Sequence, residues 1–518
     1  MIEHSIKYKL VIRVLSFLKS VSLLSLMATV SVFSQKYEIS ISMKTKNDTV
    51  MLTHVFAKKE PVWLDTTIVL KNGKGVFKGN KVLPKGLYSI YNNRRKYDII
   101  IGDHQVFGIV IDTADFIKQT KFTDSPDNDV FFKYLNHNNE RNKHLQQLSE
   151  LYKNATSDAE KNDINAKRNI LSRESLEYID KLIEENKQLY VSKIIKSLIP
   201  ILARLPEPPR DELGNITDPN FQYRWWRSHF FDNLNIFDPD MLRTEFYEDK
   251  VLEYMTRVIP QHTDTICAEL DKILEKARIN DEIFRCILVS VYNLYADSKD
   301  IVRGYVVPEN VWIHLVEKWY IPYATWSTDE NIENLRKEVA NRKPNLIGKH
   351  APPMEMLVVL PTEHFKAAAL DTAIMFNVYA GKIIEDFRKE LKSKFTVLLF
   401  WEFTCSHCKQ TIQELFKVWE EYKDDGLQVL TVQIHLTDRK DKGKWIDFVN
   451  EKNLFGAGWI NAWSPYSYKY KELYNLPNVP VIYLLDENFD IILRGNLKGN
   501  IGAETIKEFF DNQMKNQQ

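Results

Sequence analysis

The residues best suited to chemistry in this chain form one consecutive tetrad, Cys405-Ser406-His407-Cys408. An apolar run from Phe395 to Thr404 precedes it and predicts a buried strand, and the residues that follow have helical periodicity. A helix that begins at the first cysteine places unpaired main-chain N–H groups and about half a positive charge beside that sulfur. This environment favours the thiolate, the form that attacks disulfides. The spacing predicts a redox pair in which Cys405 attacks and Cys408, one turn later, resolves the mixed disulfide.

Alternating strands and helices surround the tetrad from residue 345 onward. Apolar, β-branched runs predict strands at 394–400, 427–435, 480–486 and 490–494. Helical periodicity predicts helices at 405–422, 443–453, 466–473 and 503–514. Such alternation is typical of βαβ units, in which helices cover a sheet. We therefore expect an α/β domain at 345–518.

The residues around the tetrad resemble those of a known family. Three segments are similar to matching segments of the TlpA/ResA-type thiol-disulfide oxidoreductases: Phe400-Trp401-Glu-Phe-Thr-Cys405-Ser-His-Cys408, Asn478-Val-Pro480 and Ile347-Gly-Lys-His-Ala-Pro-Pro353. The resemblance covers about residues 345–518 and implies a thioredoxin fold with protein-disulfide reductase activity. The preceding parts are similar to the uncharacterised N-terminal modules of secreted Bacteroidetes-type members, which bring no assigned activity.

The resemblance assigns roles to individual residues. Cys405 matches the nucleophile and Cys408 the resolving cysteine. Pro480 matches a cis-proline that faces the redox pair and turns the main chain at Val479 toward an extended substrate strand. Trp401 matches the aromatic residue packed beneath the active-site turn. The resemblance further implies protein thiols and disulfides as substrates, a membrane-bound thiol donor of electrons, and no cofactor.

Three positions depart from the family pattern, and two of them concern proton transfer. Leu399 occupies the position of a buried acid six residues before the nucleophile, and Thr411 occupies the position of a glutamate. Gln413 replaces a helix proline. The usual proton acceptor is therefore missing. Glu402, at the end of the predicted strand, is a candidate substitute, and an ordinary solvated carboxylate is the alternative.

His407 bears on the direction of electron flow. An imidazole between the two sulfurs stabilises the Cys405 thiolate, and hence the reduced protein, so it makes the disulfide more oxidising. The family resemblance favours a reductase, whereas His407 favours a disulfide oxidase or isomerase. Both directions stay open at this stage.

Other functions compete with a redox pair. A C-x-x-C can be half of a zinc site, but the remaining cysteines, Cys267 and Cys286, do not form a second pair of ligands, so no metal is expected. A peroxidase of the peroxiredoxin group needs proline and threonine where this chain has Leu398 and Glu402. A non-catalytic envelope binding or assembly protein on a thioredoxin scaffold stays open, because about 340 residues lie outside the redox domain.

The N-terminus predicts export. A basic stretch over residues 7–19 precedes an apolar run over 21–33, and small residues follow at its end. This pattern is typical of a secretory signal peptide, expected here at 1–34, and predicts a periplasmic mature protein. An uncleaved membrane anchor is the alternative, although the run is shorter than the ~20 residues that span a bilayer.

The rest of the sequence divides into a β-rich part and a helical part. Period-2 runs with turn residues over 36–120 predict an antiparallel β-sandwich-like domain. Helical periodicity over 125–342, with a break near 206–219, predicts an all-α region. The 70 basic and 70 acidic side chains balance, which argues against nucleic-acid binding.

Cys267 and Cys286 fall in two adjacent predicted helices. They lie at unequal distances from the intervening turn. At a rise of 1.5 Å per residue, this offsets the two cysteines by about 7 Å along the helix axes. A disulfide needs its two Cα atoms within about 7 Å of each other across the pair, so buried thiols are expected rather than a disulfide.

Overall fold

The computed structural model describes residues 37–44, 48–56, 61–92, 95–296, 308–360, 383–436, 439–464, 469–476, 478–495 and 502–515. The chain separates into two compact units, Met1–Asp249 and Lys250–Gln518. The expected signal peptide lies outside the described residues. Among the described helices, none has both the length and the apolar composition needed to cross a bilayer.

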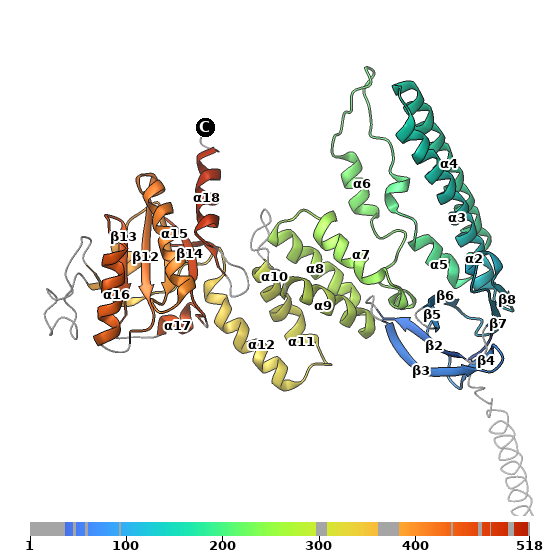
Figure 1. Cartoon of the computed structure of the whole chain (residues 1–518), viewed down its shortest axis with the longest axis horizontal. Helices are drawn as coiled ribbons and strands as arrows, with labels where there is room; N and C mark the ends of the chain where they lie inside the picture. The colour runs from blue at the N-terminus through green and yellow to red at the C-terminus, as the bar shows by residue number, and fades with distance from the viewer. Residues whose placement is uncertain are drawn as a thin grey trace, which may run out of the picture. The chain divides into compact units, whose positions relative to one another are not determined.

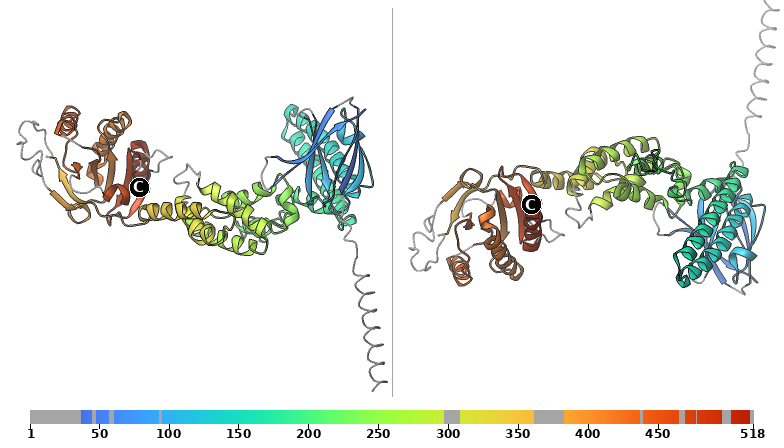
Figure 2. Two further views of the ribbon diagram at one scale, coloured as in Figure 1. Left: turned by 90° about the horizontal axis from the view of Figure 1, so that it is seen from below. Right: turned by 90° about the horizontal axis from the view of Figure 1, so that it is seen from above.

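Two four-stranded sheets form the β-rich part of the first unit, with strand orders β4-β1-β7-β8 and β3-β2-β5-β6. The strands of both sheets appear in blue in Figure 2. Their inward-facing residues, such as Ile39 of β1 and Ile90 of β5, share one core. The predicted sandwich is confirmed, with one correction: β1 and β7 pair in parallel, whereas an antiparallel arrangement was expected. The strands are β1 Tyr37–Met43, β2 Asp48–Val55, β3 Pro61–Leu70, β4 Lys74–Gly79, β5 Gly86–Asn92, β6 Arg95–Ile101, β7 Val106–Ile111 and β8 Lys121–Thr123.

Helices follow the sandwich in the first unit. The long helices α3 and α4 lie side by side (Figure 1). A capping box starts α4, because Ser157 Oγ accepts the Glu160 N–H and the Glu160 carboxylate accepts the Ser157 N–H. The helices are α2 Phe116–Gln119, α3 Pro126–Asn154, α4 Asp158–Glu185, α5 Tyr190–Ser197, α6 Phe221–His229 and α7 Tyr247–Glu253, with 3₁₀ turns η1 Ile201–Arg204 and η2 Pro239–Arg243.

The second unit begins with helices and ends with a sheet. Its helical part includes two π-helical turns, η3 and η4, each continuous with an α-helix. The elements are η3 Tyr254–Val258, α8 Thr263–Ala277, α9 Asp281–Ala296, α10 Pro308–Leu315, η4 Val316–Tyr320, α11 Ile321–Tyr323, α12 Asp329–Arg342 and η5 Lys343–Asn345.

The sheet of the second unit has seven strands in the order β10-β9-β13-β12-β11-β14-β15. The three central strands β13, β12 and β11 are parallel, and the outer pairings are antiparallel. The strands are β9 Glu355–Val359, β10 Ile383–Asp386, β11 Phe395–Trp401, β12 Leu427–Gln433, β13 Trp459–Trp463, β14 Val481–Asp486 and β15 Ile491–Arg494. Sequence analysis missed β9, β10 and β13.

Helices cover both faces of this sheet (Figure 1). Alternate residues of β11 separate the two faces: Leu399 and Trp401 pack under α15, α16 and α18, whereas Leu398 and Phe400 pack under α14 and α17. The helices are α14 Phe387–Glu390, α15 Ser406–Tyr422, α16 Arg439–Glu451, α17 Lys469–Leu473 and α18 Ala503–Lys515, and η7 Lys423–Asp425 extends α15. The predicted α/β fold of this region is confirmed.

The segment between the helices and the sheet is bonded to both. Arg494 of β15, only 5% exposed, donates to the Glu309 carboxylate of α10 at 2.8 Å. The Asn310 side chain donates to the Ile347 carbonyl at 3.2 Å. Main-chain hydrogen bonds of 2.8 Å then join residues 348–351 to the outer side of β15 and the turn before it. These contacts fix the start of the sheet domain to the last helices.

Candidate active site

The ends of three strands meet at one edge of the C-terminal sheet. Trp401, the last residue of β11, lies beside Gln433, the last residue of β12. Phe400 lies beside Val481, the first residue of β14. The tetrad follows β11, and Pro480 precedes β14, so both come to this edge. The carboxyl ends of parallel strands are where open α/β sheets bind their ligands.

Cys405 caps the N-terminus of α15. Its main chain is extended, and its sulfur accepts a hydrogen bond from the Cys408 N–H at 3.3 Å. The Cys405 N–H donates to the Glu402 carbonyl at 3.1 Å. A donor at a helix start stabilises negative charge on the sulfur that it contacts. Cys405 is partly exposed, so a disulfide from solution has access to it.

Cys408 lies in the first turn of α15 and has no exposed surface. Burial is the largest cause that raises the pKa of this thiol to about 12, and the hydrogen bond with the Cys405 sulfur acts in the same direction. A hydrogen bond with the Glu402 main chain opposes the rise in pKa. Both cysteines of the pair are thiols here. At neutral pH the Cys408 thiol is protonated, so its attack requires a group that accepts the proton.

A carboxylate lies beside the pair and is held by two side chains. Glu402 follows β11 directly, and its Oε1 accepts a hydrogen bond from Thr404 Oγ1 at 2.5 Å. Its Oε2 lies 3.3 Å from Nδ1 of His435, the second residue after β12. The side chain of Glu402 is 28% exposed and that of His435 is 51% exposed. The pair is thus partly exposed to solvent at the turn between β11 and α15.

A buried glutamine ties the two strand ends together. Gln433, 1% exposed, accepts a hydrogen bond from the Phe403 N–H and donates one to the His435 carbonyl, both at 3.0 Å. Beside it, the Ile434 N–H donates to the Trp401 carbonyl at 3.0 Å. These bonds set the position of the turn that carries Glu402 relative to the segment that carries His435.

The structure also describes the other residues that the sequence analysis singled out around the tetrad. Ser406 and His407 are exposed in the first turn of α15. Trp401 is fully buried under the turn, with its ring 5.8 Å from that of Phe448 in α16. The Val479–Pro480 peptide bond is cis, which confirms that expectation.

The structure also shows the surroundings of the positions that depart from the family pattern. Leu399 is fully buried in the same core as Cys408, so an apolar group stands where the pattern has an acid. Gln413 donates to the Lys409 carbonyl at 2.7 Å, within the helix. Glu402 contacts the Cys405 N–H and the Cys408 sulfur through its main chain. Its main chain is thus adjacent to both cysteines, while its role as a proton acceptor stays a prediction.

Comparison with known proteins identifies two parts of the chain. Residues 369–470 match the AhpC/TSA family, and residues 37–131 match a domain of unknown function, DUF4369. The C-terminal domain is thioredoxin-like. No curated protein matches the chain.

Solved structures similar to the chain are distant. A thioredoxin-like protein from Bacteroides caccae is 19% identical, with 59% of this chain and 96% of that chain covered and a TM-score of 0.38. The thioredoxin domain of a thiol-disulfide oxidoreductase from Bacteroides vulgatus is 21% identical, over 32% of this chain and 96% of that one, with a TM-score of 0.23. StoA from Bacillus subtilis is 18% identical, over 31% and 99%, with a TM-score of 0.23.

Sequence analysis missed two residues of the thioredoxin-like site. His435 contacts Glu402 across 33 positions of the sequence, and Gln433 contacts Phe403 across 30. Both come from β12 or the residues directly after it. The predicted strand 427–435 ends at His435, and the carboxyl end of a parallel strand lies at the same edge of the sheet as a motif that follows another strand. This pattern points to the edge that carries the tetrad but does not pair His435 with Glu402.

The other two cysteines lie outside the thioredoxin-like domain. Both are thiols in the described part of the chain: Cys286 of α9 is buried, as expected, whereas Cys267 of α8 is only partly buried, which corrects the expectation of two buried thiols. Burial raises the pKa of the Cys267 thiol to about 12. Among the residues that the structure describes, no group of three or more histidine, cysteine or carboxylate side chains is placed to hold a metal ion.

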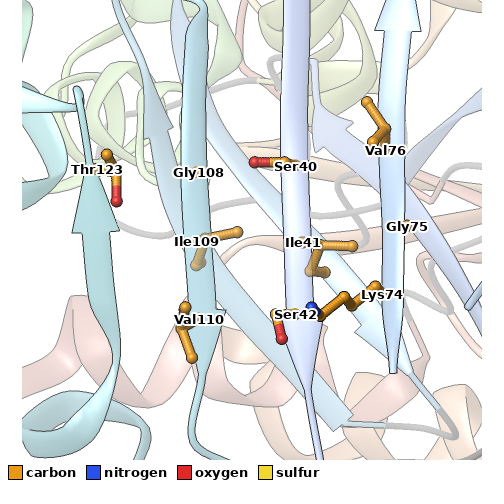
Figure 3. Close-up of a pocket in the computed structure, with 10 residues that line it drawn as sticks. All are labelled: Ser40, Ile41, Ser42, Lys74, Gly75, Val76, Gly108, Ile109, Val110 and Thr123. Atoms are coloured by element: carbon orange, nitrogen blue, oxygen red, sulfur yellow. The ribbon is translucent and has the colours of Figure 1, made fainter. Parts of the chain in front are cut away.

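A hollow of about 490 Å³ lies on the outer face of the first sheet of the sandwich, over β4, β1, β7 and β8 (Figure 3). Its polar groups come from Ser40, Ser42, Lys74 and Thr123. None of its ten lining residues is a cysteine, histidine or carboxylate, and Lys74 is the one titratable side chain among the ten.

Proposed function

We propose that the thioredoxin-like domain is a thiol-disulfide oxidoreductase that reduces protein disulfides through Cys405 and Cys408. One observation carries the proposal: a partly exposed sulfur caps α15 and accepts the N–H of a second, fully buried cysteine one turn later. This arrangement favours a thiolate at the accessible position and keeps the resolving thiol out of solvent.

The reaction proceeds in two exchanges. The Cys405 thiolate attacks one sulfur of the substrate disulfide, which forms a mixed disulfide and releases the other substrate sulfur as a thiolate. Cys408 then loses its proton and attacks the Cys405 sulfur, so the Cys405–Cys408 disulfide forms and the second substrate thiolate leaves. The substrate gains two electrons and the protein loses two. A thiol reductant must return them before the next cycle.

Partners and location follow from the sequence and belong to the same proposal. The substrates are protein disulfides, and the reductant is a thiol protein of the membrane. The basic and apolar N-terminal segment supports export of the chain to the periplasm, where such a supply of electrons is needed.

His407 favours a second candidate direction. It is exposed between the two cysteines, where a cationic imidazole stabilises the Cys405 thiolate and makes the disulfide a stronger oxidant. The alternative is therefore a disulfide oxidase or isomerase that uses the same two sulfurs.

Two measurements on the mature chain test these proposals. Thiol titration and an insulin-reduction assay should show a reversible Cys405–Cys408 disulfide and turnover that Cys405→Ser abolishes. If the disulfide does not form, or if Cys405→Ser is as active as the native chain, the chain is a binding or assembly protein. Equilibration with glutathione buffers gives the direction: a potential near about −270 mV supports a reductase, and one near about −120 mV supports an oxidase.

A further inference from the structure

The resolving step poses a proton-transfer problem in this chain. Cys408 has no exposed surface, and its thiol is protonated at neutral pH. Leu399, in the same core, offers no acceptor for that proton. Thr411, on the following turn of α15, has no group that is basic at neutral pH. A different group has to receive the proton before Cys408 can attack.

Glu402 is the carboxylate that the fold brings to the two sulfurs. Its carbonyl accepts the Cys405 N–H at 3.1 Å, and its main chain is hydrogen-bonded to the Cys408 sulfur. Its side chain is oriented from two directions, by Thr404 in the same turn and by His435 after β12. A carboxylate that is held in place in the turn before the two cysteines, and is partly exposed to solvent, is a candidate general base that acts directly or through one water.

We propose that Glu402 accepts the proton of Cys408 in the resolving step, and that His435 is a positioning residue that orients the Glu402 carboxylate and passes the proton on to solvent. This inference rests on the proposed oxidoreductase function.

The charges around Glu402 come from three elements. Cys405 and Cys408 face it from α15, and a negative charge on Glu402 raises the pKa of Cys408. His435 faces it from the segment after β12. Lys471 faces it from α17; burial lowers the pKa of that ammonium, and the charge of Glu402 opposes the change. The carboxylate thus contacts Thr404 and His435, and its charge acts on Cys408 and Lys471.

The proton and the electron pairs balance in this step. Glu402 takes the Cys408 proton, and the resulting thiolate forms a bond with the Cys405 sulfur. The bond between Cys405 and the substrate sulfur breaks, and that sulfur leaves as a thiolate with the electron pair. The proton on Glu402 passes through His435 to water or to the departing thiolate, which returns Glu402 to its anionic form.

The step is measured directly with an aromatic disulfide, 5,5′-dithiobis(2-nitrobenzoate), in a stopped-flow experiment on the reduced mature chain. Attack by Cys405 releases one coloured thiolate, and attack by Cys408 releases the second. The leaving group needs no proton, so the second phase reports proton removal from Cys408. A Cys405→Ser chain supplies the background from the other thiols.

In Glu402→Gln we expect the second phase to slow by about 100-fold or more at neutral pH, within the range for general-base catalysis. The first phase should change by less than about threefold, since the helix N-terminus that activates Cys405 is retained. The deficit should shrink at high pH, where hydroxide removes the proton. Acetate in solution should restore part of the second phase in Glu402→Ala, which a purely structural loss would not permit.

His435→Phe tests the positioning role. It should slow the second phase by about tenfold and change its pH profile, because the carboxylate loses one of its two side-chain partners. The matched control is Glu420→Gln, which removes an exposed carboxylate from α15, far along the helix from the two cysteines, and should leave both phases unchanged.

The outcomes separate the two proposals. If the native chain releases only one thiolate and forms no Cys405–Cys408 disulfide, the proposed function fails and this inference fails with it. If the native chain shows both phases but Glu402→Gln keeps the native second phase and pH profile, only the role of Glu402 is wrong. If Glu402→Gln slows the second phase but His435→Phe does not, only the role of His435 is wrong.

Discussion

Replacement of Gln433 by leucine should loosen the active-site turn. The native side chain satisfies the buried Phe403 N–H and the partly exposed His435 carbonyl, each at 3.0 Å. Leucine has nearly the same volume as glutamine, so little stability is lost through formation of a cavity. The Phe403 N–H loses its acceptor, at a cost of about 1–3 kcal/mol, while the His435 carbonyl can turn to water at little cost. We expect the turn to open more easily by about 1–3 kcal/mol.

Hydrogen exchange on the reduced full-length chain measures this opening. A global unfolding curve does not resolve the opening of one turn, because in a chain with several domains it reports only the transitions of whole domains. Exchange instead reports the opening of one segment. At about 1.4 kcal/mol per tenfold, the amide of Phe403 should exchange about 5- to 150-fold faster in Gln433→Leu than in the native chain.

Gln428→Leu is the matched control on the same strand. The side-chain oxygen of Gln428 is buried and has no hydrogen-bond partner within the described part of the structure. Its replacement should leave exchange of the turn unchanged, and it should stabilise the strand slightly, since a buried polar atom without a partner is removed. Equal exchange of the turn in Gln433→Leu and Gln428→Leu would refute the assignment of Gln433 as the tie between the two strand ends.

Three further predictions concern stability. Because the pKa of Cys408 is about 12 in the folded chain and about 8.5 when unfolded, the folded chain binds more protons between these values. This thiol should therefore lower the stability of the reduced chain above about pH 8.5 by up to about 1.4 kcal/mol per pH unit. Cys408→Ala should remove that share of the loss between pH 8 and pH 10 in urea unfolding, whereas the share from Cys267, whose pKa is also raised to about 12, should persist. Gly443→Ala in α16 should raise stability by about 0.5–1 kcal/mol, because the added Cβ meets open space. Gly456→Ala should lower stability, because at a φ of +155° the added Cβ would overlap the Trp419 ring. Shifts of the same sign for both variants in thermal unfolding would contradict this prediction. Glu309→Ala leaves Arg494 buried without its carboxylate and should cost about 3–5 kcal/mol in denaturant titrations, and a loss below about 1 kcal/mol would class the pair with surface ion pairs.

The tetrad and its immediate elements could be predicted because the governing interactions are local. An apolar run, a C-x-x-C and a helical period follow one another within about 30 residues, and α15 starts at Ser406 with Cys405 as its cap. The cis bond before Pro480 was expected from the family resemblance. The helix predicted at 443–453 begins earlier, at Arg439, because polar residues in its first turn mask the period.

The residues that complete the site depend on long-range pairing, which the sequence does not display. A strand was predicted to reach His435, but β12 ends at Gln433, and the next two residues turn toward β11. Nothing in the sequence indicates that β12 lies beside β11. The five-residue strand Trp459–Trp463 was missed for a related reason: a short apolar run after two glycines gives too few periods to distinguish a strand from a loop.

The hydrogen bonds between residues 348–351 and β15 have a consequence for dissecting the chain. An edge strand with open N–H and C=O groups is a template for pairing with another molecule. Here the outer side of β15 is occupied by the segment that arrives from α12, through the Gly348 and Ala351 N–H groups. A fragment that begins after Ala351 would expose that edge and should self-associate, whereas one that begins before Leu346 would keep it covered. Residues 348–351 thus prevent edge-to-edge association of the sheet, in addition to connecting it to the preceding helices.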